Sequence, residues 1–460
     1  MRSLAALLLG LALLPARAVA AEAWQPPVLT TERYNEDWSN LADPANRTGH
    51  WTEGFKYIPL DGSGADYLTT GVEIRLRDED YHGNWTNPDA PNDGYLWVRA
   101  MPYADLHVGQ VRAFVQPILA YAAGVRPSAS PIDQTRTDLL QGFADVAFDV
   151  GSGATLRLRA GREMIGLGTE RLVGTRYGPN VPLAFDGGRA ILHSGRLTVN
   201  GFYLMPVEPG QGTFDDRTSS SRALWGVYAT RLIGGAGVDL YYLGYRNDHA
   251  RFEQGNGHEL RHTIGARFFG KGDGWHWNFE AMGQFGRFDG GSIGAWSMAS
   301  EVGRGFAALP LKPDLTVRFN VASGDKSSGD HKLGTFNALF PKGKYFGELS
   351  PVGPYNLVNL QPVLAFDLGG GVSTSLAGAA YWRQSTGDGV YDIPGHLLRA
   401  SSGSTARFVG KEVEASVEWR ATAELTLGAS LSWFQSGAFL RETGTASNIR
   451  MTGLEANFRF

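Results

Sequence analysis

Cysteine is missing from this 460-residue chain, charged residues are few, and long apolar runs are almost absent. Without cysteine there are no disulfides and no thiolate metal sites. Beyond the N-terminal residues, no stretch reaches the ~18 apolar residues of a membrane-spanning helix, which excludes a helical membrane protein. Charged residues make up only 19%, and no basic run points to a nucleic-acid partner. The formal net charge of -4 says little about partners.

Glycine and aromatic residues are abundant instead. The chain has 61 Gly and 12% aromatic residues. This composition is typical of a transmembrane β-barrel, which has many tight turns and an aromatic girdle at each membrane interface. No linker or shift in composition marks a second domain, although the length alone would suggest two or three soluble domains.

The first residues have the pattern of an export signal. Arg2 is followed by an apolar run over residues 4–14 and by the small-residue site Ala18-Val19-Ala20. The run is too short to span a bilayer. The sequence therefore predicts a signal peptide over residues 1–21, cleaved near Ala21 or Glu22.

The last ten residues alternate between an apolar and a polar face. Leu454, Ala456, Phe458 and Phe460 share one face, and a period of two is typical of a strand. An apolar outer face with a polar inner face is what a barrel strand needs. The ending Phe-Arg-Phe resembles the final strand of bacterial outer-membrane proteins. In that class the terminal strand closes the barrel and is read by the assembly machinery, which implies a closing role for Phe458 and Phe460.

The same alternation recurs along the chain. It predicts an all-β, up-and-down antiparallel transmembrane barrel of about eighteen strands. The domains expected are a pre-barrel segment over residues 22–65 and a barrel over residues 66–460. The strands are expected at residues 68–77, 95–103, 111–121, 140–150, 154–160, 188–193, 197–205, 223–232, 238–246, 260–269, 275–285, 293–302, 315–321, 359–368, 372–383, 409–419, 425–433 and 451–460.

Three long stretches do not alternate: residues 24–65, 163–186 and 325–355. Loops longer than about 12–15 residues are usually functional or disordered. Long loops of barrels are extracellular, and in porins some fold into the pore. The aromatic girdle is expected from Trp97, Trp225, Tyr241, Tyr242, Trp296, Tyr381, Trp382, Trp419 and Trp433.

From about Arg33 onward, the chain resembles the alginate export family of outer-membrane proteins. The segments that carry the resemblance are RYNEDW at 33–38, FKYIPL at 55–60, LTTGVEIR at 68–75, GRE at 161–163, GTRYGPN at 174–180, FDGGR at 185–189 and KGKYFG at 342–347. The motifs at 178–180 and 185–186 are not those of the alginate exporter itself, so the resemblance is to a broader branch. It implies a monomeric barrel that passes an anionic polysaccharide or a related organic anion, with Arg162 as a pore arginine.

Arginines on expected inner faces offer a physical basis for such a pore. A guanidinium presents a fixed fork of donors to a carboxylate, and several in a narrow lumen attract anions. Neighbouring acids such as Asp145 and Glu163 would favour an ion-paired ladder that stiffens the wall. In that case the channel would pass neutral or hydrophobic solutes. Arg159 and Glu412 are expected in a wet lumen, because a dry core would leave them unpaired. The candidate pore-lining residues are Arg75, Arg77, Arg157, Arg159, Arg162, Arg176 and Arg189.

The residues give little support for catalysis or for a metal site. His193 and Ser194 are adjacent, so a strand would send them to opposite faces and prevent a dyad. We expect Asp78, Glu79 and Asp80 to form a solvated acidic turn rather than a calcium site. The sequence predicts a non-enzymatic protein of a Gram-negative outer membrane, without a cofactor. Its expected partners are lipid, lipopolysaccharide, the assembly machinery and an anionic solute.

Overall fold

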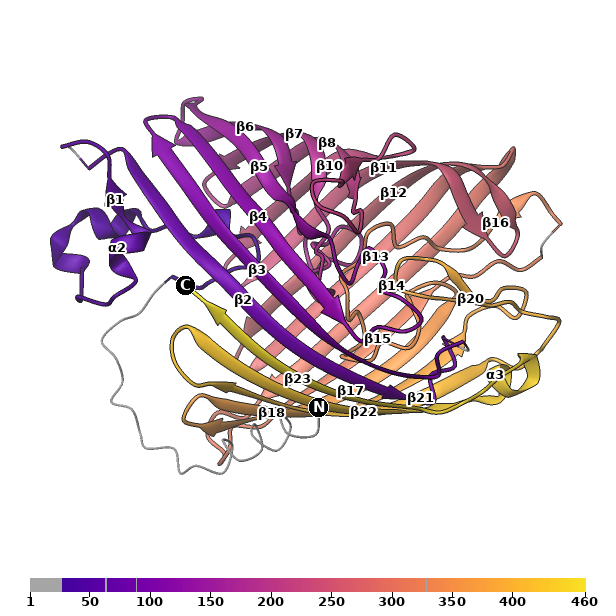
Figure 1. The fold of residues 1–460 in the computed structure, drawn as a ribbon. Coiled ribbons are helices and arrows are strands. Elements are labelled where there is room, and N and C mark those ends of the chain that lie inside the picture. The colour runs from indigo at the N-terminus through magenta and orange to yellow at the C-terminus, as the bar shows by residue number, and fades with distance from the viewer. Residues whose placement is uncertain (1–26, 63, 88, 328) are drawn as a thin grey trace.

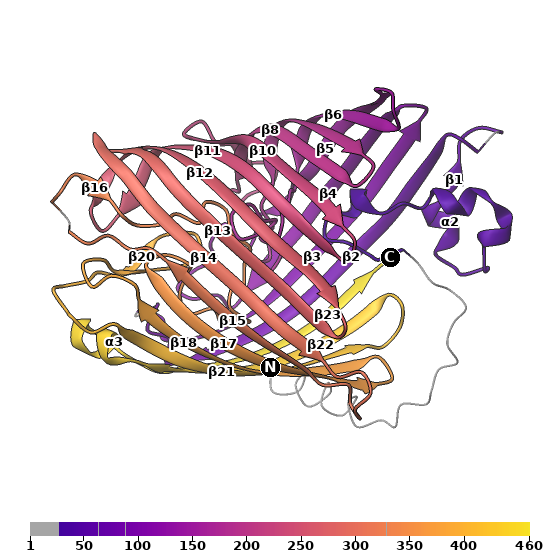
Figure 2. The ribbon, with the colours of Figure 1, turned by 180° about the vertical axis from the view of Figure 1, so that it is seen from behind.

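The computed structural model describes residues 27–62, 64–87, 89–327 and 329–460, so the expected signal peptide lies outside the described residues. A closed wall of tilted antiparallel strands dominates the molecule (Figures 1 and 2). Its eighteen strands are β2 (Tyr67–His82), β3 (Asn92–Val108), β4 (Val111–Ala123), β5 (Arg136–Asp149), β6 (Ala154–Glu163), β7 (Phe185–Ser194), β8 (Leu197–Glu208), β10 (Arg222–Ile233), β11 (Ala236–Phe252), β12 (Gly255–Gly272), β13 (Trp275–Phe288), β14 (Gly291–Gly305), β15 (Asp314–Ala322), β17 (Leu357–Gly369), β18 (Val372–Arg383), β21 (Phe408–Arg420), β22 (Leu425–Ser436) and β23 (Ile449–Arg459).

The last strand closes the ring. β23 pairs with β2 from Arg459 opposite Glu73 to Arg450 opposite His82. Each wall strand also pairs with its neighbours, so the wall has no free edge. Closure satisfies the backbone polar groups without water, which a strand in lipid requires. The predicted fold, its strand number and its closure by the C-terminal strand are confirmed.

Strand alternation separates a lipid-type outer face from a polar inner face. On β2, Ile74 and Leu76 are 42% and 44% exposed, while Arg75 and Arg77, which alternate with them, are buried. Phe279, Trp296, Met298, Phe319 and Leu431 continue the apolar outer face on other strands. A band of this kind suits hydrocarbon rather than water.

Some aromatic residues expected in the girdle point inward instead. The Tyr241 hydroxyl donates to Glu280, and the Tyr381 hydroxyl donates to Glu412. Trp97 is also buried, on the same face of its hairpin as its partner Arg77. The girdle prediction was wrong for these three residues, because alternation fixes the two faces of a strand and aromatic character does not say which face is used.

The two ends of the barrel differ in their connections. At one end, turns such as 109–110, 195–196 and 234–235 are short, and at the other end the segments 164–184, 323–356 and 384–407 are long. Short turns are periplasmic and long loops extracellular in such barrels, which orients the molecule. Residues 27–62 of the pre-barrel segment and residue 460 both lie at the short-turn end (Figure 1).

The structure also contains short helices and short strands outside the eighteen strands of the wall. Among the described residues, no helix is long and apolar enough to cross a membrane. The acidic residues Asp78, Glu79 and Asp80 belong to β2 and not to a turn. The remaining elements are η1 (Arg33–Asn35), η2 (Ser39–Ala42), η3 (Pro44–Asn46), α2 (Glu53–Lys56), β1 (Ile58–Pro59), β9 (Arg217–Thr218), β16 (Lys332–Leu333), β19 (Val390–Tyr391), β20 (Leu397–Arg399) and α3 (Ala438–Thr443).

Candidate functional site

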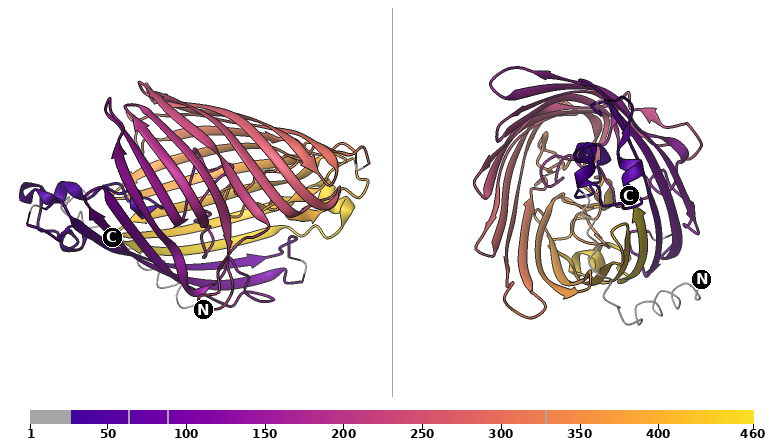
Figure 3. Two further views of the ribbon diagram at one scale, coloured as in Figure 1. Left: turned by 90° about the horizontal axis from the view of Figure 1, so that it is seen from above. Right: turned by 90° about the vertical axis from the view of Figure 1, so that its left-hand side faces the viewer.

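Two long loops fold into the barrel and join each other. Segments 164–184 and 323–356 meet in a short parallel bridge between Val173 and Phe340. The Gly174 N–H donates to the Phe340 carbonyl at 2.8 Å, and the Phe340 N–H donates to the Leu172 carbonyl at 2.9 Å. The view along the barrel shows chain inside the ring (Figure 3). The joined loops therefore narrow the lumen, as the lengths of the two non-alternating stretches suggested.

The loop contact rests on an apolar patch of the inner wall. Phe340 packs edge-on against Phe185 of β7 at 5.1 Å and against Tyr245 of β11 at 5.6 Å between ring centroids. Val173 and Leu204 belong to the same buried cluster. Burying this apolar surface opposes any outward movement of the loops.

Two arginines of the wall bind loop backbone rather than a solute. Arg75 donates to the Tyr177 carbonyl at 3.1 Å and to the Pro179 carbonyl at 2.7 Å. Arg99 donates to the same two carbonyls, and it also binds Glu73 at 2.8 Å. These contacts hold residues 177–180 against β2 and β3. Arg99 was not among the predicted pore residues, and nothing in the strand period distinguishes it.

Other wall arginines form an ion-paired ladder. The Arg159 side chain is only 3% exposed, and it binds Asp145 at 2.8 Å and Glu163 at 2.9 Å. Arg157 binds Asp145 at 3.3 Å, and Arg189 binds Glu163 at 2.8 Å. Each carboxylate is shared between two guanidinium groups, which neutralises much of the positive charge on this part of the wall.

Arg77 is neutralised in the same way on the neighbouring part of the wall. It contacts Glu79 of its own strand, Glu348 of loop 323–356 at 2.7 Å and Glu455 of β23 at 3.0 Å. Lys344 also contacts Glu348. This cluster ties the loop to the strands that close the barrel.

Arg162 lies on the other face of β6. Strand alternation puts it opposite to Arg157 and Arg159, and its guanidinium binds Asp186 at 2.9 Å and the Leu139 carbonyl at 3.1 Å. Arg162 is therefore not part of the ladder. The sequence groups it with Arg157 and Arg159 because of the family motif and not because of the strand period.

Two cations on the loops differ from the wall arginines. Among the described residues, neither Arg176 nor Lys342 forms an ion pair, and Arg176 donates only to the Pro341 carbonyl at 3.3 Å. Burial lowers the pKa of both groups, and Arg171 and Arg318 lower the pKa of Lys342 further. A positive charge that is not neutralised therefore lies at the contact between the loops.

The pre-barrel segment enters the lumen from the short-turn end. Tyr34 packs edge-on against Phe114 and Phe143 of the inner wall, and its hydroxyl donates to the Met164 carbonyl at 2.6 Å. The Arg159 guanidinium lies 4.3 Å from the Tyr34 ring. The segment thus touches both the ladder and the start of loop 164–184. The sequence pattern places these residues before the barrel and carries no sign that they fill it.

Lys56 fixes the base of this segment. Its fully buried ammonium donates to the Tyr103 hydroxyl at 2.7 Å and to the Thr70 carbonyl at 3.0 Å. The rings of Trp38 and Phe460 lie 5.0 and 5.1 Å away. Burial and the nearby Arg33 lower the pKa of Lys56 to about 6.

The predicted wet lumen is only partly present. Arg159 and Glu412 are 5% and 4% exposed. Their partners lie on the wall: Asp145 and Glu163 bind Arg159, and Tyr381 donates to Glu412. The expectation that these side chains face open water was wrong. Periodicity shows which residues face inward, but not what fills the space inside.

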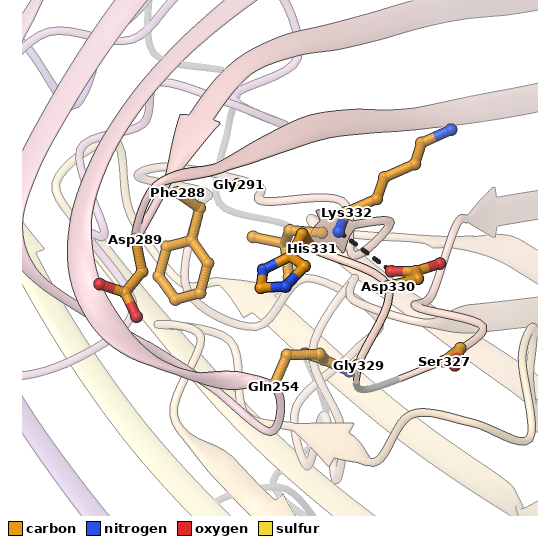
Figure 4. Close-up of a pocket in the computed structure, with 10 residues that line it drawn as sticks. Gln254, Phe288, Asp289, Gly291, Ser327, Gly329, Asp330, His331 and Lys332 are labelled. Atoms are coloured by element: carbon orange, nitrogen blue, oxygen red, sulfur yellow. Dashed lines mark hydrogen bonds between the residues drawn. The ribbon is translucent and has the colours of Figure 1, made fainter.

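The remaining clusters offer little chemistry. His193 lies 3.1 Å from the Thr198 hydroxyl on the next strand, and strand alternation sends Ser194 to the opposite face. Asp138, Asp215 and Asp216 bring carboxylate oxygens within 4.8 Å of one another, but Asp138 already accepts the Asp216 N–H. A shallow cavity of about 280 Å³ lies beside Phe288 at the rim, where its side chains diverge (Figure 4).

The fold and one family agree with this geometry. The family model described as "Alginate export" matches residues 66–453. Comparison with curated proteins gives no match. Similar solved structures include OccK2 (OpdF) from Pseudomonas aeruginosa in complex with glucuronate, at 12% identity and a TM-score of 0.57, covering 85% of this chain and 98% of that one. OccAB1 from Acinetobacter baumannii has 12% identity and a TM-score of 0.58, covering 89% and 100%. A BenF-like porin from Pseudomonas fluorescens Pf-5 has 9% identity and a TM-score of 0.58, covering 85% and 98%.

Proposed function

The chain belongs to the alginate export family and is an outer-membrane channel, and on that premise we propose that it carries small organic anions by facilitated diffusion and is not an enzyme. The observation that carries this proposal is the difference in pairing. Arg176 and Lys342 on the joined loops have no ion pair among the described residues, whereas the ladder on the wall does. A cation without a partner at a constriction attracts anions.

The joined loops favour a small solute over a long polymer. Backbone hydrogen bonds link the two loops, and Arg75 and Arg99 fix one of them to the wall. Passage of a polymer would require these contacts to open. A single uronate unit is the smallest solute with the chemistry of alginate, and OccK2 was solved with glucuronate.

A channel for neutral or hydrophobic solutes is the second candidate. The ladder of Arg157, Arg159 and Arg189 supports it, since their charges are neutralised by Asp145 and Glu163. In that case the arginines stiffen the wall, and the loops restrict size without selecting charge.

We further propose that the barrel works as a monomer surrounded by lipid and lipopolysaccharide. The apolar outer face supports contact with lipid along the wall. A signal peptide over residues 1–21 would deliver the chain for export, and the barrel assembly machinery would insert it. Detection of the mature N-terminus by mass spectrometry tests the first of these steps.

The deciding experiment measures reversal potential across a salt gradient in a planar bilayer. The wild-type channel is compared with the loop variant R176Q/K342Q and with the wall variant R157Q/R162Q, which removes the same number of charges. We expect anion preference in the wild type and in the wall variant, and its loss in the loop variant. A wild type without charge preference supports the neutral-solute channel, and equal losses in both variants contradict the role of the loops.

Solute size is tested on vesicles that contain the channel. We expect labelled glucuronate to enter faster than glucose, and oligomers of several uronate units to be excluded. If the oligomers enter at a rate similar to that of glucuronate, an anionic polysaccharide becomes the favoured solute instead.

A further inference from the structure

We propose that a cavity at the outer mouth is a binding site for a carboxylate carried on a six-membered ring; this rests on the proposed anion channel and names its capture site. The cavity has a volume of about 490 Å³. It lies where the long-loop ends of β10, β11 and β12 meet the loops 164–184, 323–356 and 384–407. Sites for small ligands typically measure ~300–1,000 Å³.

Cations dominate the walls of the cavity. Arg176 and Arg251 line it without an ion pair among the described residues. Arg222 lines the cavity as well and forms an ion pair with Glu208 at 3.1 Å, and both of these side chains are partly exposed. His249 adds a group that can carry positive charge. A carboxylate entering here meets guanidinium groups that are free to bind it in a bidentate way.

The negative charges at the cavity are already neutralised. Glu259 is the one carboxylate among its lining residues, and it accepts from Arg261 at 2.5 Å and from Asn337 at 3.1 Å. Asp392 lies outside the lining and binds His396 at 2.9 Å. The space inside the cavity therefore has a net positive character.

Aromatic residues form one part of the lining, which we call the floor. Tyr245, Phe340 and Tyr355 line the cavity and are each nearly buried, so they present fixed apolar surface. Phe252 extends the apolar lining at the side. A ring-shaped ligand can pack against these rings while its carboxylate binds the arginines of the same lining. An inorganic anion would leave the floor unused.

The cavity is continuous with the loop contact. The ring of Phe340 forms part of the floor, while its backbone joins loop 164–184 at 2.8 and 2.9 Å. Arg176 also lines the cavity and donates to the Pro341 carbonyl of the other loop. A solute held here lies directly beside the constriction, which suits a site that captures anions before they pass.

The test measures binding by calorimetry to the refolded full chain in detergent, with glucuronate, benzoate and glucose as probes. We expect both carboxylates to bind and glucose not to bind. In the variant R251Q, the affinity for the carboxylates should fall about tenfold, as for the loss of one charge-assisted hydrogen bond. The matched control is R420Q, because Arg420 lies at the short-turn end of β21.

Each outcome decides something. If only one of the two carboxylates binds, the result shows whether the site prefers a sugar ring or an aromatic ring, and it supports the proposed site. No carboxylate binding to the wild type, or equal affinity in R251Q, overturns the site even if the bilayer shows anion preference. Carboxylate binding in a channel without charge preference leaves the site standing and removes the proposed anion transport.

Discussion

The arginines of the wall and the cations of the loops have the same charge and different surroundings. On the wall, Arg159 is buried between Asp145 and Glu163, so its charge is used within the protein. On the loops, Arg176 and Lys342 have no such partner among the described residues. The difference shows that charge lining a barrel is not by itself a selectivity filter. Only a charge without a protein partner is available to a solute.

The largest effect is expected when the buried arginine of the ion-paired ladder is removed. The substitution R159M leaves Asp145 and Glu163 buried with less compensation, which should lower the free energy of unfolding by about 3–5 kcal/mol. Urea unfolding of the barrel in lipid vesicles measures it. The matched variant R157M should lose at most about 1 kcal/mol, since the Arg157 side chain is 32% exposed. Equal losses would contradict the difference in burial.

A wall arginine can also be deprived of one of its ion-pair partners, which makes it more similar to the unpaired cations of the loops. The variant E163Q keeps the shape of Glu163 and removes the charge that neutralises Arg159 and Arg189. One unit charge within a few Å of the path is worth ~1 kcal/mol in water, so anion preference should rise about fivefold. Reversal potentials measure this. The control D186N frees Arg162 on the other face of β6 and should leave the preference unchanged.

A smaller effect is expected where the pre-barrel segment joins wall and loop. The variant Y34F keeps the ring between Phe114 and Phe143 but removes the hydrogen bond to Met164. Docking of the segment should weaken by about 1 kcal/mol, seen as faster proteolysis before β2. The hydroxyl of Tyr67 has no hydrogen bond among the described residues, so Y67F should cleave at the wild-type rate. Identical rates for the two variants would count against this anchor.

The same docking should also depend on pH. The pKa of Lys56 is about 6 when docked and ~10.4 in a free segment, so docking releases a proton between these values. The undocked form binds more protons there, and docking should strengthen as pH rises from about 6 to ~10. Proteolysis rates at pH 6.5 and 8.5, normalised to K56M, measure the change. A ratio independent of pH would show that Lys56 stays charged.

The strands were predictable from sequence because each strand carries its own evidence. An inner residue such as Arg75 and an outer residue such as Ile74 are neighbours in the chain, so alternation encodes the wall locally. The possible ion-paired ladder could also be proposed from nearby acids such as Asp145. The closing role of the last strand was implied by its resemblance to the final strand of outer-membrane proteins.

The filling of the lumen was not predictable in the same way. Arg75 binds the carbonyls of Tyr177 and Pro179, which lie about a hundred residues further along the chain. Carbonyl groups occur at every residue, so the sequence carries no mark of which ones are used. Tyr34 likewise inserts between two rings of distant strands. Contacts of this kind depend on the closed barrel and have no local pattern.

The bridge between Val173 and Phe340 has a consequence for how such a channel can evolve. Neither loop can change its length or path without disturbing the other, because each supplies both donors and acceptors to the hydrogen bonds at their contact. Insertions in one loop should therefore be accompanied by compensating changes in the other among related chains. New solute ranges in this branch would arise by paired exchange of the two loops on a wall that stays the same.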